Sequence, residues 1–130
     1  MVKEFETKAF KIKLHPNGLK EILVKKNVIL QPEDVWESHQ LSVEKLLLPR
    51  YYVLLESEEN SSVSQEAKRA VASEEYSKHA GALALCSSKT TENILGNLFL
   101  KVNKPKVTTH FFTDRNQAIK WLDDRILEDR

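Results

Sequence analysis

The sequence predicts an α/β fold in which a single mixed five-stranded sheet packs against about four helices. Near the N-terminus, an Asn17-Gly18 turn separates two segments suited to strands, which predicts an antiparallel hairpin. Further along, short apolar runs at 81–86 and 107–112 alternate with segments of helical periodicity. This alternation is typical of parallel strands connected by helices. We therefore expect a hairpin, a helix and then three strand–helix pairs, all within one domain over residues 1–130.

The first half of the chain contains the hairpin, the first helix and a buried strand. Alternation over 5–14 predicts the first strand, and 19–24 is expected to return beside it. Pro32 suits the first turn of a helix, and Pro49 ends that helix. Its apolar stripe has helical spacing and comprises Val35, Trp36, His39, Val43, Leu46 and Leu47. The continuous apolar run 51–55 predicts a strand buried on both faces.

The polar segment 56–62 predicts a loop before the second helix. Either Ser62 or Ser64 is expected to cap that helix, which we place over 65–78. Its apolar face consists of only Ala67, Ala70 and Val71, so it buries little area. The next buried strand is expected to open at Gly81.

The remaining elements are a broad apolar helix, a strand and a final helix. The broad helix is predicted to end at Asn103-Lys104-Pro105, with Leu100 pointing away from its apolar face. After the strand at 107–112, Thr113 or Asp114 is expected to cap the last helix. The inner stripe of that helix comprises Ala118, Trp121 and Leu122, and we expect the charged residues 123–130 to form a fraying tail.

Composition narrows the function classes. The 130 residues are 41% hydrophobic and 30% charged, which is typical of a globular protein. Twenty basic residues against 19 acids give a net charge of +1. A nucleic-acid-binding protein usually has an excess of basic residues, so we do not expect this protein to bind nucleic acid. Cys86 is the only cysteine, which excludes an intramolecular disulfide and favours a reducing compartment. No transmembrane run or secretory signal is visible, so we expect a cytoplasmic protein.

Several short motifs occur in the second half of the chain, and they are Ser73-Glu74-Glu75, Ala82-Leu83-Ala84-Leu85, Leu95-Gly96-Asn97-Leu98-Phe99-Leu100, Asn103-Lys104-Pro105, Phe112-Thr113-Asp114, Ala118 and Trp121-Leu122. Through these motifs the sequence resembles a bacterial family of short STAS/SEC14-like proteins with a SpoIIAA-like fold, and the resemblance covers well over half the chain. The order of elements is also similar to that of anti-sigma-factor antagonists and sulfate-transporter (STAS) domains. Because members of the family are largely uncharacterised, the resemblance implies a fold more firmly than an activity.

The antagonists carry a phosphorylatable serine in an Asp-Ser-Ser-Gly loop, and the matching loop here is 56–62. The pair Ser61-Ser62 has no preceding aspartate and no following glycine. Nearby acids Glu56, Glu58 and Glu59 would also repel an added phosphate. We therefore favour a plain capping loop over a phosphorylation switch, although the sequence leaves phosphorylation of the serines in 57–64 open.

The search for chemistry finds no complete catalytic or metal constellation in the sequence. The four histidines lack a metal-ligand spacing, so no metal site is expected. Cys86 ends a strand before a helix start, which suits a thiolate, but no base lies nearby in sequence. His39 on its apolar stripe is a second weak candidate for catalysis. The 87–91 hydroxyls lack the glycines of a phosphate loop, and lysines at 101–106 are expected to form a solvated face. We expect neither enzymatic activity nor a cofactor.

Two functions fit these observations better than catalysis. The first is a non-catalytic protein-interaction or regulatory module that binds another protein or itself, as a homodimer. Its expected contacts are Ser57, Ser61, Ser62, Asn97, Phe99, Leu100 and Lys104. The alternative is a carrier or sensor of a small apolar ligand or lipid. That function would need a cavity between helix 91–104 and the sheet, with Phe99 and Trp121 in its wall.

Overall fold

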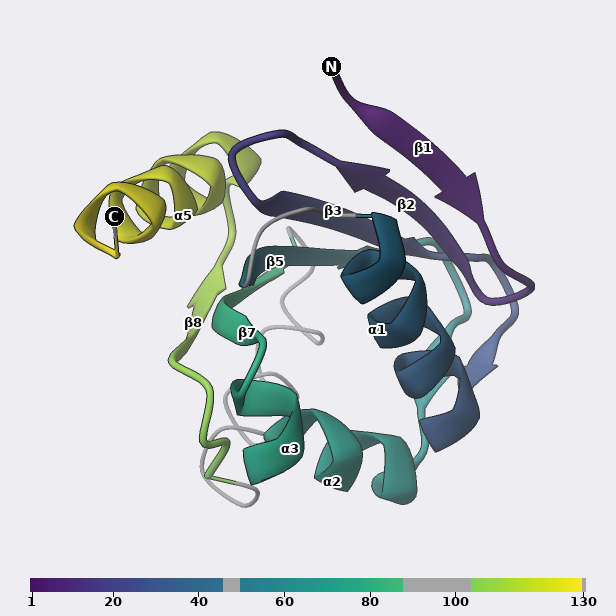
Figure 1. The fold of residues 1–130 in the computed structure, drawn as a ribbon. Helices are drawn as coiled ribbons and strands as arrows, with labels where there is room; N and C mark the ends of the chain where they lie inside the picture. The colour runs from purple at the N-terminus through teal and green to yellow at the C-terminus, as the bar shows by residue number, and fades with distance from the viewer. Residues whose placement is uncertain (46–49, 88–103, 130) are drawn as a thin grey trace.

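The computed structural model describes residues 1–45, 50–87 and 104–129. Its main sheet has six strands in the order β1-β2-β3-β5-β7-β8 (Figure 1). The β1-β2-β3 part is antiparallel, whereas β3, β5, β7 and β8 are parallel neighbours. The strands are β1 (Lys3–Glu6), β2 (Phe10–Leu14), β3 (Leu19–Val24), β5 (Tyr51–Ser57), β7 (Ala80–Cys86) and β8 (Thr109–Phe112).

Helices lie on both faces of this sheet. One face carries α1 (Pro32–Lys45), α2 (Gln65–Ala72) and α3 (Glu74–Ser77), and the other carries α5 (Arg115–Glu128) (Figure 1). A second, two-stranded parallel ribbon pairs β4 (Ile29–Leu30) with β6 (Ser62–Val63). Within the described ranges, no helix is both long and apolar enough to cross a membrane.

The predicted α/β class and mixed sheet are confirmed, but the sheet has six strands where five were expected. The segment 5–14, expected as one strand, forms β1 and β2 with a tight turn between them. Thr7 makes this turn: its Oγ1 accepts hydrogen bonds from the backbone N–H groups of Ala9 and Phe10. The sequence pattern does not reveal this turn, because the alternation of apolar and polar residues in both strands has the same period of two residues.

Helix ends follow their caps, with two corrections. Ser64 caps α2 and Asp114 caps α5, each by accepting backbone N–H bonds, as expected. The helix predicted over 65–78 breaks at Ser73, whose Oγ caps α3 by accepting from Tyr76 N. The fraying tail expected at 123–130 is wrong, because α5 continues to Glu128 and Ile126 is buried against the sheet. Burial of one further turn stabilises the helix where charge alone suggested fraying.

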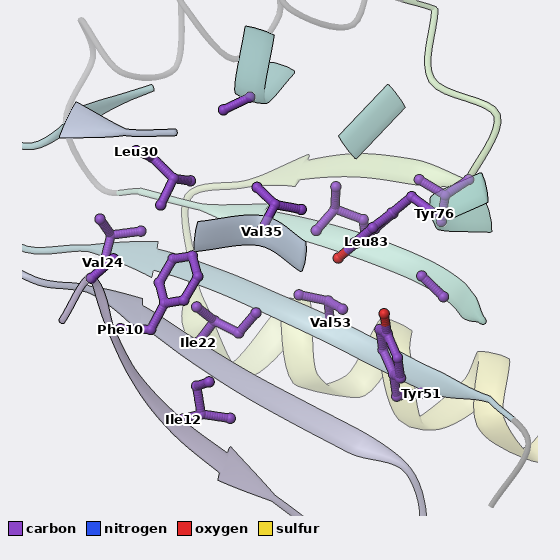
Figure 2. Close-up of a cluster of buried hydrophobic side chains, with 14 of the residues drawn as sticks. Phe10, Ile12, Ile22, Val24, Leu30, Val35, Tyr51, Val53, Tyr76 and Leu83 are labelled. Carbon is purple, nitrogen blue, oxygen red and sulfur yellow. The ribbon is translucent and has the colours of Figure 1, made fainter. Parts of the chain in front are cut away.

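Two apolar clusters occupy the two faces of the sheet. The larger lies beneath α1, α2 and α3; Figure 2 shows Phe10, Ile22, Val53 and Leu83 of the sheet meeting Val35 of α1. The smaller lies beneath α5 and includes Leu54, Ala84 and Leu122. Because successive residues of a strand face opposite sides, Tyr51 and Tyr52 enter different clusters.

The inner face of α1 is more polar than its sequence predicted. Val43 of the expected stripe is 45% exposed, whereas Asp34, Ser38 and Ser42 are buried. Lys20 of β3, which is 1% exposed, contacts α1 at Ser38. Lys20 Nζ donates to Ser38 O at 3.2 Å and lies 4.5 Å from the centroid of the Tyr51 ring. A cation–π contact and one carbonyl replace only part of the water that a charged amine needs.

Burial lowers the pKa of Lys20 to about 7, so the amine loses its charge near neutral pH. In the unfolded chain the pKa returns to an ordinary lysine value of about 10.4. The unfolded state therefore binds more protons than the folded state between these two values. The contribution of Lys20 to the free energy of unfolding is therefore least favourable at and below neutral pH, and it becomes more favourable as the pH rises.

We predict that Lys20→Met stabilises the protein at pH 7. The wild-type free energy of unfolding should rise by about 3 kcal/mol between pH 7 and 9.5 through this lysine, and Lys20→Met should abolish that rise. Urea denaturation across this pH range measures both quantities. The matched control is Lys11→Met on neighbouring β2, where the lysine is exposed. Identical pH profiles for wild type and Lys20→Met would contradict the assignment.

Candidate binding site

A cavity of about 300 Å³ lies at the carboxyl ends of the parallel strands. The register brings these ends together: Val24 of β3 pairs with Ser57 of β5, and Leu85 of β7 pairs with both Leu55 and Phe111. The β4–β6 ribbon and α2 contribute the opposite wall through Leu30, Val63 and Val71. Ligands in open α/β sheets bind characteristically outside the carboxyl ends of the strands.

Most of the surface of the wall is apolar, although polar side chains also contribute to it. Its apolar side chains come from the sheet, the ribbon and α2, and they are Val24, Leu30, Leu55, Val63, Val71, Leu83, Leu85 and Phe111. The remaining described lining residues are Glu56, Ser57, Ser61, Ser62, Lys68, Cys86 and Ser87. An apolar wall with a small number of polar groups is the usual composition of a small-molecule site.

The turn that carries the serines is held in place by hydrogen bonds. Ser61 Oγ donates to Glu58 O at 2.9 Å, and Asn60 Nδ2 donates to Asn27 Oδ1 at 2.7 Å. Asn60 itself has a φ of 58°, which asparagine adopts more readily than most residues. The serine-bearing turn is therefore anchored to the segment before β4 by one side-chain hydrogen bond that spans 33 positions in sequence.

A charged network lies beside the cavity and includes one of its lining residues. Arg115, the first residue of α5, donates through Nε to Glu56 Oε1 at 3.1 Å and also pairs with Glu21. His15 Nε2 contacts the second oxygen of Glu21 at 2.5 Å. Burial alone would raise the pKa of Glu21, but the His15 hydrogen bond and the Arg115 charge lower it. Glu56 therefore enters the cavity wall already paired with Arg115.

Cys86 is a half-buried thiol in the cavity wall at the end of β7. Burial and the carboxylate of Glu56 raise its pKa, and Asp114 acts in the same direction. Arg115 opposes this shift without reversing it. A thiol with a raised pKa holds little thiolate at neutral pH, and the thiolate is the nucleophile. This environment argues against Cys86 as an activated nucleophile.

His39, the other weak catalytic candidate, lies in an aromatic cluster away from the cavity lining. Its Nδ1 is 2.5 Å from the Tyr51 hydroxyl, and its ring centroid is 5.0 Å from that of His79. Burial, His79 and Lys20 lower the pKa of His39. Among the described residues, no three His, Cys, Asp or Glu side chains gather in a way that could hold a metal.

A larger hollow, of about 680 Å³, lies on the opposite face of the sheet, over β1, β2 and β3. Opposite charges alternate across its strands: Lys13 pairs in register with both Glu4 and Glu21, and its Nζ lies 3.8 Å from Glu4 Oε1. Lys13 and Glu4 compensate each other largely in solvent, and Glu21 is already engaged by His15 and Arg115, so these side chains leave little charge for a ligand. We therefore regard the smaller, apolar cavity as the better candidate site.

The sequence matches the family described as a domain of unknown function, DUF7793, over residues 12–125. The chain belongs to the DUF7793 family. Among curated proteins, none matches the sequence significantly. A similar solved structure is an uncharacterised protein of the DUF3478 family with a SpoIIAA-like fold, from Shewanella loihica PV-4. The two share 12% identity with a TM-score of 0.51, over 94% of this chain and 92% of the other. This likeness confirms the SpoIIAA-like fold that the sequence motifs suggested.

The candidate contacts predicted for this DUF7793 chain divide into three groups. Ser57, Ser61 and Ser62 are brought together in the cavity wall. Lys104 is exposed, with a φ of 46°, and lies outside the lining of both hollows. Asn97, Phe99 and Leu100 lie outside the described residues, as does most of the helix 91–104 proposed to cover an apolar cavity.

Trp121 was expected to line an apolar cavity beneath helix 91–104, most of which lies outside the described residues, and it is not among the residues that line the cavity at the strand ends. It lies on α5, where it contacts Phe112 at a centroid distance of 5.5 Å. That packing belongs to the cluster on the face of the sheet opposite the cavity. Sequence reasoning missed Lys68 and Phe111 as lining residues. For Lys68, the helical spacing to Val71 was the available signal, since residues three apart share a helix face.

We predict that the Cys86 thiol reacts with iodoacetamide at pH 8 about tenfold more slowly in the folded than in the urea-unfolded protein, because its raised pKa leaves little thiolate. Glu56→Gln should accelerate the folded-state reaction by removing a nearby negative charge. The matched control is Glu59→Gln, which removes an exposed acid paired with Lys26 and should not change the rate of alkylation. Rapid alkylation of the folded wild type would contradict this environment and reopen the case for a nucleophile.

Proposed function

We propose that this protein is a non-catalytic binding protein that holds a small, largely apolar molecule in the cavity at the carboxyl ends of β3, β5, β7 and β8. The observation that carries the proposal is the cavity of about 300 Å³, whose wall is mostly apolar and contains serines. A volume near the lower limit for small-molecule sites suits a single alkyl chain or a compact aromatic compound of two or three rings. A two-chain lipid would not fit within it.

The non-catalytic part of the proposal rests on the two groups that the sequence had offered as catalysts. The surroundings of Cys86 raise its pKa, and His39 is engaged with Tyr51 outside the cavity lining. Neither is therefore equipped to activate a bound molecule.

Binding to another protein was the first function expected from the sequence, and the exposed Ser57 and Ser62 are compatible with it. The cavity favours the ligand-binding alternative, because a flat protein contact does not require an apolar hollow behind the serines. Self-association and protein binding become outcomes of the test below.

We predict that N-phenyl-1-naphthylamine, a neutral apolar fluorophore, binds one site saturably and that Val71→Phe weakens this binding at least about tenfold. Val71 lines the cavity from α2, so the larger ring should occupy the ligand's space. The matched control is Val43→Phe, which places the same substitution on an exposed position of α1. Fluorescence titration measures binding, and thermal unfolding checks that each variant is folded.

A second measurement needs no mutation. Because Cys86 lines the cavity, saturating fluorophore should slow its alkylation by iodoacetamide. Absence of saturable binding, or equal binding by Val71→Phe and wild type, would overturn the ligand proposal. If binding is absent and light scattering shows a dimer that Ser62→Arg dissociates, self-association through the serine-bearing turn would replace it.

A further inference from the structure

The one basic side chain among the described lining residues of the cavity belongs to Lys68, in the middle of α2. It is half-buried, and it forms no ion pair with any described residue. Glu56, which lines the cavity from β5, is bound by Arg115 through Nε at 3.1 Å. Lys68 therefore brings to the cavity wall a positive charge that no ion pair with a described residue compensates.

Hydroxyl groups line the same cavity as this charge. Ser57 and Ser62 line the cavity, and no hydrogen bond of either side chain occurs within the described part of the chain. Ser61 uses its hydroxyl hydrogen on Glu58 O, so its oxygen remains only an acceptor. An ammonium and two hydroxyl donors form a set that suits an anionic head group.

The rest of the wall determines the body of such a ligand. Eight apolar side chains favour an alkyl or aromatic body, and burial of that body supplies the main driving force. One uncompensated cation suits a head group with one negative charge. A phosphate monoester carries between one and two charges at neutral pH and would be only partly neutralised.

Resting on the proposed ligand-binding function, we propose that the cavity binds an apolar carboxylate, with its head group held by Lys68 and the hydroxyls of Ser57 and Ser62. The carboxylate places its charge at the lysine, and its apolar body lies against Leu55, Leu85 and Phe111. The pairing satisfies both charges at an apolar surface, where an unpaired charge is costly.

The test compares octanoate, octanol and octyl phosphate as competitors of N-phenyl-1-naphthylamine at pH 7.5. Octanoate should bind at least about tenfold more tightly than octanol, because a hydrogen-bonded charge pair adds to the same apolar contact. Lys68→Met should remove that advantage, so that octanoate binds this variant no more tightly than octanol does. The matched control is Lys26→Met, which removes an exposed lysine paired with Glu59 and should change neither.

The possible outcomes separate this inference from the proposed function. If the fluorophore binds but octanoate and octanol compete equally, the carboxylate assignment fails and the apolar site stands. Stronger competition by octyl phosphate than by octanoate would also overturn it, in favour of a phosphate head group. Retention of octanoate's advantage in Lys68→Met would exclude the lysine as its partner. If the fluorophore does not bind wild type, both proposals fail.

Discussion

The parallel pairing of β5 with β3 is the constraint on which the rest of this structure depends. Two parallel strands cannot be joined by a tight turn, so the chain between them must cross one face of the sheet. Here it does so through α1, which covers the larger apolar cluster. Tyr51 to Leu54 are then buried on both faces of β5, which requires α5 on the opposite side. The two-faced architecture follows from this one strand.

The same pairing places the cavity. Parallel strands end at the same edge of a sheet, so Val24, Ser57 and Cys86 arrive near one another although they are far apart in sequence. The β4–β6 ribbon closes over that edge, because each of its strands adjoins the carboxyl end of β3 or β5. At this edge Arg115 pairs with both Glu21 and Glu56. Lys68 has no such partner among the described residues.

Local signals predicted the fold well wherever one face of an element was chemically distinct. The Asn17-Gly18 turn, the Ser64 cap and the apolar runs of β5 and β7 each correspond to an observed feature. The sequence-based predictions failed where two different structures have the same local sequence pattern. The Thr7 turn kept the alternation of a single strand, and the charged end of α5 hid a buried Ile126. For the candidate site, the serines of 57–62 were identified in advance, but their apolar neighbours were not.

The sequence by itself determined the class, the mixed sheet and the resemblance to a SpoIIAA-like fold, because periodicity, capping and turn chemistry act over a few residues. Only the tertiary structure decided that Lys20 is buried beside Tyr51, that Trp121 faces away from the cavity, and that Lys68 joins the serines at its wall. Each of these depends on partners brought from distant segments by strand register and helix packing. A side chain's environment, unlike its helical or strand preference, is set by contacts that the local sequence does not contain.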